Sequence, residues 1–401
     1  MNKTDEKPAM SLLRSIFHID HFIVSALTLG VIGLLVFITV NLEFLNPVVR
    51  ALEGFSMTDI YYKIQHSDTP QLNQKITLVD ITDLSYNDRD KIAQVVEQIS
   101  SMEPSVLGVD VIFENLKGSP ESNMLLTDAF FNAPTNTVLA VKLTDPDLET
   151  KTFSNSVHSF FVSETHQTEG TVNVTNNPNH SMTSYPTYFV KDNDTLYSLP
   201  VQVSRFLGFD APPRQQFIIN YRGTVFPVVK WNELEQHREL IENHIVLLGC
   251  TEEESDKHLT PIGQMAGLNI LAYSILSIIE GEEVAEAPVW VYLLWALIAG
   301  WIANMIDLLV TKRLEKRKST FILFVLKSGL YARLISFLIL AALTYVSFIL
   351  FTRFDYDLSS VLALTVTVLI GEGRLLYTAF LAVLKRKGIP GWEKSIYATI
   401  I

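Results

Sequence analysis

The chain has 401 residues, of which 48% are hydrophobic and 18% are charged, and its formal net charge is −12 at pH 7. That apolar share is high for a soluble protein and is typical of a chain that combines membrane-spanning and soluble parts. The single cysteine, Cys250, excludes an intramolecular disulfide, so any folded domain must be held together by its core alone.

The first long apolar segment, residues 22–42, contains no charged side chain. At about 1.5 Å per residue it is long enough to cross a hydrocarbon core of about 30 Å. It is longer than the apolar region of a signal peptide, and no Ala-x-Ala site follows it, so we interpret it as a retained anchor. Three further spans are predicted at about 289–310, 331–351 and 358–384, the last of which contains Glu372 and Arg374.

The distribution of Lys and Arg predicts the orientation of these spans. Basic residues concentrate in segment 1–21, between the second and third spans, and in the tail 385–401, so all three are expected in the cytoplasm. Segment 43–287 then lies outside, with 34 acidic and 15 basic residues, a net charge of 15 − 34 = −19. Such an acidic domain argues against nucleic-acid binding. We expect a protein of the bacterial inner (plasma) membrane whose outer domain is periplasmic or extracellular.

The outer segment opens with a strand–helix alternation. Residues 76–81 are an apolar, β-rich run, typical of a strand that is covered on both faces. A helix capped by Asn87 or Asp88 follows, because the next apolar residues recur at helical spacing. Repeated strand–helix units predict parallel strands joined by right-handed crossovers. The alternation continues with a strand at 105–113, a helix at 119–133 and a strand at 137–143.

The amino-acid composition changes between residues 144 and 193, which are polar and rich in Asn, Thr and Ser. We interpret this stretch as an antiparallel excursion or long loops at the edge of the sheet. The predicted fold class is therefore an α/β outer domain, with a mostly parallel sheet, βαβ units and an antiparallel excursion, plus an α-helical membrane region. Later predicted elements are a helix at 196–209, a strand at 216–223, a mostly helical connection at 231–243, a core strand at 244–250 and an apolar helix at 263–281.

Several charged residues follow predicted strands and are candidate ligand-binding residues. In an open α/β sheet the binding crevice lies outside the carboxyl ends of the strands. Carboxylates gathered there could hold a divalent cation, or they could cap helices and bind backbone amides in the turns; whether a metal binds stays open. The candidates are Asp80, Asp83, Arg89, Asp110, Arg222 and Asp256.

The sequence lacks the motifs of the common catalytic sites. It has no glycine-rich phosphate loop after a strand, no G-x-S-x-G elbow, no H-E-x-x-H and no C-x-x-C. We therefore predict a membrane protein without enzymatic activity or cofactor. The alternative is a membrane-anchored, metal-dependent hydrolase that uses the aspartates.

The order of short motifs resembles a known family. After one span come "LVDITD", "GVDVIF", "INYRG", "FPVV", "IVLLGCT" and "GLNILA", followed by a cluster of spans. This series, over about residues 43–310, resembles the CHASE type 2 domain, an extracytoplasmic sensory domain. Arg89 fits the family's Arg position at the first helix. In the family's final helix motif, Gly-x-Glu-x-His-Ala-Asn, three polar positions are replaced here by Asn269, Leu271 and Tyr273.

The resemblance implies an unknown small ligand and a signal that is passed across the membrane. Relatives usually carry an output domain after the spans, whereas the tail 385–401 is too short to fold as one. We therefore expect a stand-alone sensor that acts on a separate cytoplasmic signalling partner or output protein, and a homodimer is left open.

Overall fold

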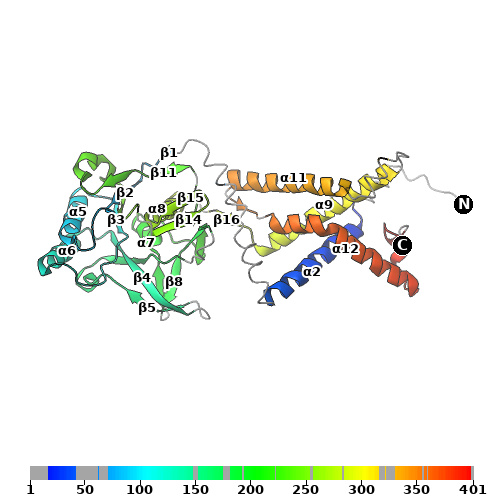
Figure 1. Ribbon diagram of the computed structural model, residues 1–401, viewed down its shortest axis with the longest axis horizontal. Coiled ribbons are helices and arrows are strands. Elements are labelled where there is room, and N and C mark those ends of the chain that lie inside the picture. Colours follow the sequence, from blue (N-terminus) through cyan, green and yellow to red (C-terminus); the bar gives the residue numbers. More distant parts are fainter. Residues whose placement is uncertain are drawn as a thin grey trace. The chain divides into compact units, whose positions relative to one another are not determined.

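The computed structural model describes residues 17–41, 62, 71–147, 152–174, 181–191, 194–221, 223–252, 256–281, 284–315, 321, 330–354, 356–358 and 360–398. The chain divides into two compact units, residues 58–285 and residues 1–57 with 286–401. Each unit is treated by itself below, with its elements labelled in Figure 1.

The core of unit 58–285 is a seven-stranded sheet in the order β12-β2-β13-β3-β4-β5, with β6 also paired to β4. All of these neighbours are parallel except β4 and β5, which pair antiparallel. The predicted fold class, an α/β domain with an antiparallel excursion, is confirmed. The strands are β2 (Ile76–Asp80), β3 (Val106–Val109), β4 (Thr137–Asp147), β5 (Thr152–Val157), β6 (Thr168–Thr171), β12 (Val228–Lys230) and β13 (Ile245–Gly249).

Helices cover both faces of this sheet. Helices α5 (Arg89–Ser101) and α6 (Pro120–Asn132) share a hydrophobic core with Leu107 and Val109 of β3. Gly108, between these two residues, faces the other way, and a Cβ there would meet Leu199 and Val203. Because successive side chains of a strand alternate between faces, α7 (Leu199–Phe206) lies on the opposite face from α5 and α6. Helix α8 (Gly267–Glu280) packs beside α7. Double coverage explains why β2, β3 and β13 are buried along their whole length.

Small strand pairs surround the main sheet. The predicted strand at 216–223 is shorter than expected: it ends at Ile218 and belongs to a separate pair with β7. The predicted helical connection at 231–243 is a 3₁₀ segment, η3 (Leu234–Leu240), broken by the non-helical backbone of His237. The pairs are β1 (Gln71–Leu72) with β11 (Thr224–Val225), β7 (Ser184–Pro186) with β10 (Gln216–Ile218), β8 (Tyr188–Lys191) with β9 (Asp194–Tyr197), and β14 (Lys257–Thr260) with β15 (Gly263–Ala266).

Within the described residues, the other unit contains four helices long and apolar enough to cross a membrane. Close helix contacts rest on small residues: Gly373 of α12 lies against Thr28 of α2, and Gly300 of α9 against Ser25 of α2. Small side chains allow membrane helices to approach each other and gain van der Waals packing. The helices are α2 (Ile19–Asn41), α9 (Val289–Glu315), α11 (Leu330–Phe354) and α12 (Val361–Arg386).

Buried polar groups tie the membrane helices to the segment after α12. The Asp20 carboxylate of α2 accepts hydrogen bonds from Tyr377 Oη (2.8 Å), Ser395 Oγ (2.7 Å) and the Ile396 amide (2.7 Å). Arg374 of α12 forms an ion pair with Asp307 of α9. The charge of Arg374, unexpected within an apolar span, is therefore compensated by a neighbouring helix.

Candidate ligand-binding site

Three adjacent parallel strands, β2, β13 and β3, end at the same edge of the sheet. Asp110 directly follows β3, and its backbone amide donates to the carbonyl of Leu248 (2.8 Å). A Cβ on Gly249, at the end of β13, would lie 3.3 Å from Asp110 Cβ and 2.9 Å from Leu268 Cδ1. Glycine at this position therefore lets the start of α8 and the Asp110 side chain approach the strand end closely.

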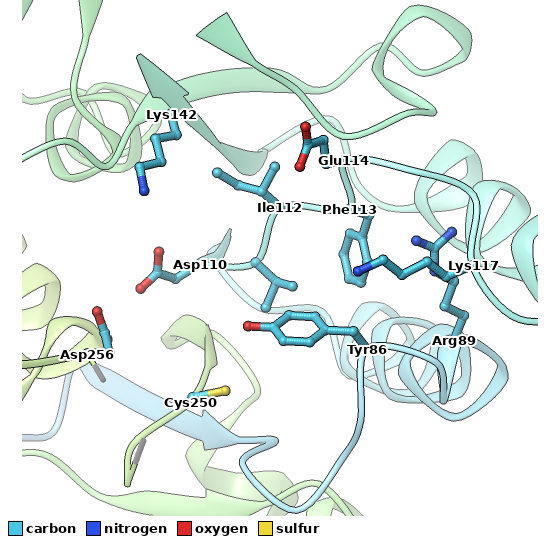
Figure 2. A pocket seen from close by; sticks show the side chains of 11 residues that line it. Tyr86, Arg89, Asp110, Ile112, Phe113, Glu114, Lys117, Lys142, Cys250 and Asp256 are labelled. Atoms are coloured by element: carbon cyan, nitrogen blue, oxygen red, sulfur yellow. The ribbon is translucent and has the colours of Figure 1, made fainter. Parts of the chain in front are cut away.

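Two hollows open at this edge, of about 410 and 380 Å³, and both are lined by Asp110, Lys142 and Asp256. Since they share these three side chains, we treat them as one cavity, the Asp110 pocket. Figure 2 shows the side chains of Lys142 and Asp256 pointing toward Asp110. The first hollow is also lined by Tyr86, Arg89, Glu114, Lys117 and Cys250, and the second by Asn173, Tyr185, His258, Ile270 and Leu271.

Asp110 is an acid of the pocket whose carboxylate has no hydrogen-bond donor among the residues that the structure describes. Burial raises the pKa of Asp110 to about 7, the negative charge of Asp256 raises it further, and His258 opposes the rise. Burial and Asp256 therefore disfavour the charged form of Asp110, and His258 offsets only part of their effect.

Tyr185 of β7 supplies a second unsatisfied group. Its side chain is only 1% exposed, and its hydroxyl has no hydrogen-bond partner in the described part of the chain. Burial raises the pKa of the hydroxyl well above its usual value, and the charges of Asp110 and Asp256 add to this. A buried polar group without a partner costs roughly 1–3 kcal/mol, so this hydroxyl is available to bind a molecule in the cavity.

Asp256 and Lys142 complete the charged lining. Asp256 Oδ2 accepts a hydrogen bond from the amide of Gly267 (3.0 Å), the first residue of α8, and its Oδ1 lies 3.6 Å from His258 Nε2. A Cβ on Gly267 would lie 2.7 Å from Asp256 Oδ2, so glycine is needed there. Lys142 of β4 is exposed and forms no ion pair with any described carboxylate.

Asp80 has a structural role. It is 5% exposed, and its Oδ1 accepts hydrogen bonds from Thr82 N (3.1 Å), Thr82 Oγ1 (2.5 Å) and Thr251 N (3.1 Å). Burial would raise the pKa of Asp80, but these hydrogen bonds outweigh it and lower the pKa below its usual value. Asp80 therefore joins the loop after β2 to the loop after β13, as the capping alternative expected.

The other predicted residues are dispersed. Asp83 is exposed, and its Oδ2 lies 3.5 Å from Lys230 Nζ. Arg89 is 1% exposed, donates to Asn123 Oδ1 and the Asn115 carbonyl, and lies over the Phe160 ring, so it forms a wall of the pocket. Arg222 lies outside the described residues. Of the six candidates, the structure brings Asp110 and Asp256 together and places Arg89 on the same pocket.

Sequence reasoning missed Lys142, Tyr185 and His258. Lys142 ends the buried run of β4 and is its first charged residue, which is a usable signal. His258 lies in the β14–β15 hairpin, within a stretch that looks like a solvated acidic loop. Tyr185 lies in the polar excursion, where no local pattern indicates burial.

Replacing Asp80 with alanine is expected to destabilise the outer domain by about 1–3 kcal/mol, because three donors lose their acceptor. Since the pKa of Asp80 is lowered by folding, its contribution is present above the unfolded-state pKa and is lost as pH falls through the folded-state value. Thermal unfolding of the full chain at pH 7 and pH 3 measures this. An equal loss of stability at both pH values would contradict the assignment.

An α/β domain with a ligand-sized pocket at the strand ends, in a chain with four helices that could span a membrane, is the arrangement of a membrane protein with a binding domain. The profile of the CHASE2 domain matches residues 31–308, more than half of the chain, and the protein belongs to the CHASE2 family of extracytoplasmic sensory domains. Comparison with curated proteins and with solved structures found no match.

The metal-dependent hydrolase finds no support at this site. Within the described residues, no three His, Cys, Asp or Glu side chains are placed so that they could hold a metal ion. Asp80, which was one of the proposed cation ligands, already uses one carboxylate oxygen for three hydrogen bonds.

Proposed function

We propose that this protein is an extracytoplasmic sensor that binds a small polar ligand in the Asp110 pocket and signals through its membrane helices to a cytoplasmic partner. One observation carries the proposal: the pocket contains two groups, the Asp110 carboxylate and the Tyr185 hydroxyl, without hydrogen-bond partners in the described structure. A ligand that satisfies both would bind the folded domain selectively and stabilise it.

Three further observations support an outer location for the α/β domain and a binding role, rather than a catalytic role, for its pocket. The Lys and Arg distribution favours a cytoplasmic location for the basic segments and an outer location for residues 43–287. A bacterial inner membrane with a periplasmic domain fits this arrangement. The family is sensory, and the sequence lacks phosphate-loop and hydrolase motifs, so the pocket is assigned binding rather than catalysis.

The test is a thermal-shift screen of the full chain in detergent micelles against small polar metabolites. A ligand of the Asp110 pocket should stabilise the parent protein and lose roughly tenfold or more in affinity in Asp110→Asn and Tyr185→Phe. The exposed Asp210→Asn serves as the matched control and should bind as the parent does. Ligand stabilisation that survives both pocket variants would place the site elsewhere.

Signalling needs its own readout. Hydrogen exchange of the full chain, with and without the ligand, should show changed protection in the membrane helices as well as at the pocket. If protection changes only at the pocket, the protein binds the ligand but does not transmit a signal to its membrane helices, which would contradict the sensor assignment.

A further inference from the structure

We propose that the ligand is an amino-acid-type zwitterion, with its ammonium group between Asp110 and Asp256, its carboxylate at Lys142 and an apolar side chain. This inference rests on the proposed function and names the ligand class for the same pocket.

The acidic end of the pocket is built for a cation. Asp110 offers two carboxylate oxygens that no described donor uses, and one oxygen of Asp256 is held by the Gly267 amide while the other lies 3.6 Å from His258 Nε2. Two carboxylates that line one pocket repel each other, and a bound cation replaces that repulsion by attraction.

The acidic end of the pocket suits an ammonium group better than a metal ion. An ammonium group has three N–H donors, which match Asp110, Asp256 and the oxygen of the Tyr185 hydroxyl. The charges of Asp110 and Asp256 both act on that hydroxyl, which places it at the acidic end. A divalent metal is a poorer match, because no group of three His, Cys, Asp or Glu side chains suited to a metal ion occurs among the described residues.

The opposite charge is supplied by Lys142. It lines both hollows, so its ammonium group faces the space that adjoins Asp110. It forms no ion pair with a described carboxylate and is therefore available to bind an anion. A lone acidic cluster would select cations, whereas acids with a lysine across the same cavity select a ligand that carries both charges.

The remaining wall indicates the side chain. The second hollow is lined by Val172, Val174, Ile270 and Leu271 next to the Tyr185 ring. These apolar groups cannot satisfy a polar substituent but can pack against a branched or straight hydrocarbon. Each hollow has the volume of a small ligand site, about 300–1,000 Å³. The apolar amino acids fit this combination of charges and wall.

The experiment uses a matched trio of probes on the full chain in micelles, with calorimetry as the readout. L-Leucine carries both charges, 3-methylbutylamine lacks the carboxylate, and 4-methylpentanoic acid lacks the amine. Leucine should bind at least about tenfold more tightly than either partial analogue, because each analogue lacks one of the two charge-assisted contacts. Alanine, valine, isoleucine and methionine extend the comparison to other side chains.

Variants assign each charge to its residue. Asp110→Asn should weaken leucine and the amine roughly tenfold or more and leave the acid unchanged, and Lys142→Gln should weaken leucine and the acid and leave the amine unchanged. Asp210→Asn and Lys230→Gln, both exposed and outside the pocket, are the matched controls. Melting curves of each variant establish that it is folded.

Two outcomes would overturn the inference in different ways. If a neutral polyol or Ca²⁺ binds in an Asp110-dependent manner while no apolar amino acid does, the ligand class is wrong and the proposed sensor stands. If amino acids bind but both pocket variants bind them as the parent does, the Asp110 pocket is not the binding site. The proposed function then also loses its support, because that support comes from the unpartnered groups of this pocket.

Discussion

Asp110→Asn is expected to melt at a higher temperature than the parent protein at pH 8, and by a smaller margin at pH 5. In the folded domain burial and Asp256 raise the pKa of Asp110 to about 7, whereas an unfolded aspartate titrates near about 3.9. Between these values the folded state holds a proton that the unfolded state has released. Stability is therefore full below the unfolded-state pKa and is lost as pH rises through 7. A shift of about 3 pKa units corresponds to at most about 4 kcal/mol, and an uncharged Asn avoids that cost.

The measurement is thermal unfolding of the full chain from pH 5 to pH 8 without added ligand. The difference between parent and variant should grow across this range, while Asp210→Asn, an exposed acid, should follow the parent. The charged or titratable groups that line the pocket around Asp110 are Tyr86, Arg89, Glu114, Lys117, Lys142, Tyr185, Cys250, Asp256 and His258. Repeating the series in a His258→Gln background removes the neighbouring imidazole whose charge acts on Asp110. Parallel curves for parent and variant would show that Asp110 has a partner and would weaken its assignment to a ligand.

The sequence predicted the sheet because its strands are short apolar runs separated by helices of clear periodicity. The helix predicted at 119–133 begins as its sequence favours: Ser119 Oγ accepts a hydrogen bond from the Ser122 amide (3.1 Å), and Pro120 lies in the first turn. The meeting of Asp110 and Asp256 also followed from the rule that parallel strands end at one edge. Where segments have regular hydrophobic periodicity, the sequence therefore predicts both the elements and the edge of the sheet at which they meet.

Asp80 and Asp110 looked equivalent in the sequence, since each follows a buried strand. Their different roles depend on the residue two positions later, which is Thr82 after Asp80 and Ile112 after Asp110. A threonine at that position offers an amide and a hydroxyl to the carboxylate, so Asp80 is satisfied locally. Isoleucine offers no side-chain donor, so the Asp110 carboxylate has no local hydrogen-bond partner. This signal was present in the sequence and could have separated the two aspartates.

Tyr185 could not have been identified in the same way. It is buried because β7 pairs with β10, which sets Tyr185 opposite Phe217, more than 30 residues further along the chain. Burial that depends on pairing between distant segments of a polar excursion leaves no periodic trace near the residue itself. The most informative group of the pocket was therefore hidden in the least regular part of the sequence.

The fourth membrane helix also has a contact with a distant segment that its own sequence does not reveal. Glu372 and Arg374 made it the weakest predicted span, because charges in an apolar helix are costly. The structure gives Arg374 a partner, Asp307, on another helix, and that pairing is not visible in either segment alone.

Arg374→Met is expected to destabilise the membrane helices by about 3–5 kcal/mol, because it leaves Asp307 buried without its counter-charge. Asp307 is only 6% exposed, and its Oδ1 already has no hydrogen-bond partner among the described residues. The double variant Asp307→Leu/Arg374→Met removes both charges and should recover most of the loss, since apolar pairs often replace buried ion pairs without cost. Glu372→Gln, an exposed acid two residues away on the same helix, should have little effect and is the matched control. Unfolding of the full chain by SDS in mixed micelles gives the midpoints. A single variant as stable as the parent, or a double variant as unstable as the single, would mean that the ion pair does not hold α9 and α12 together.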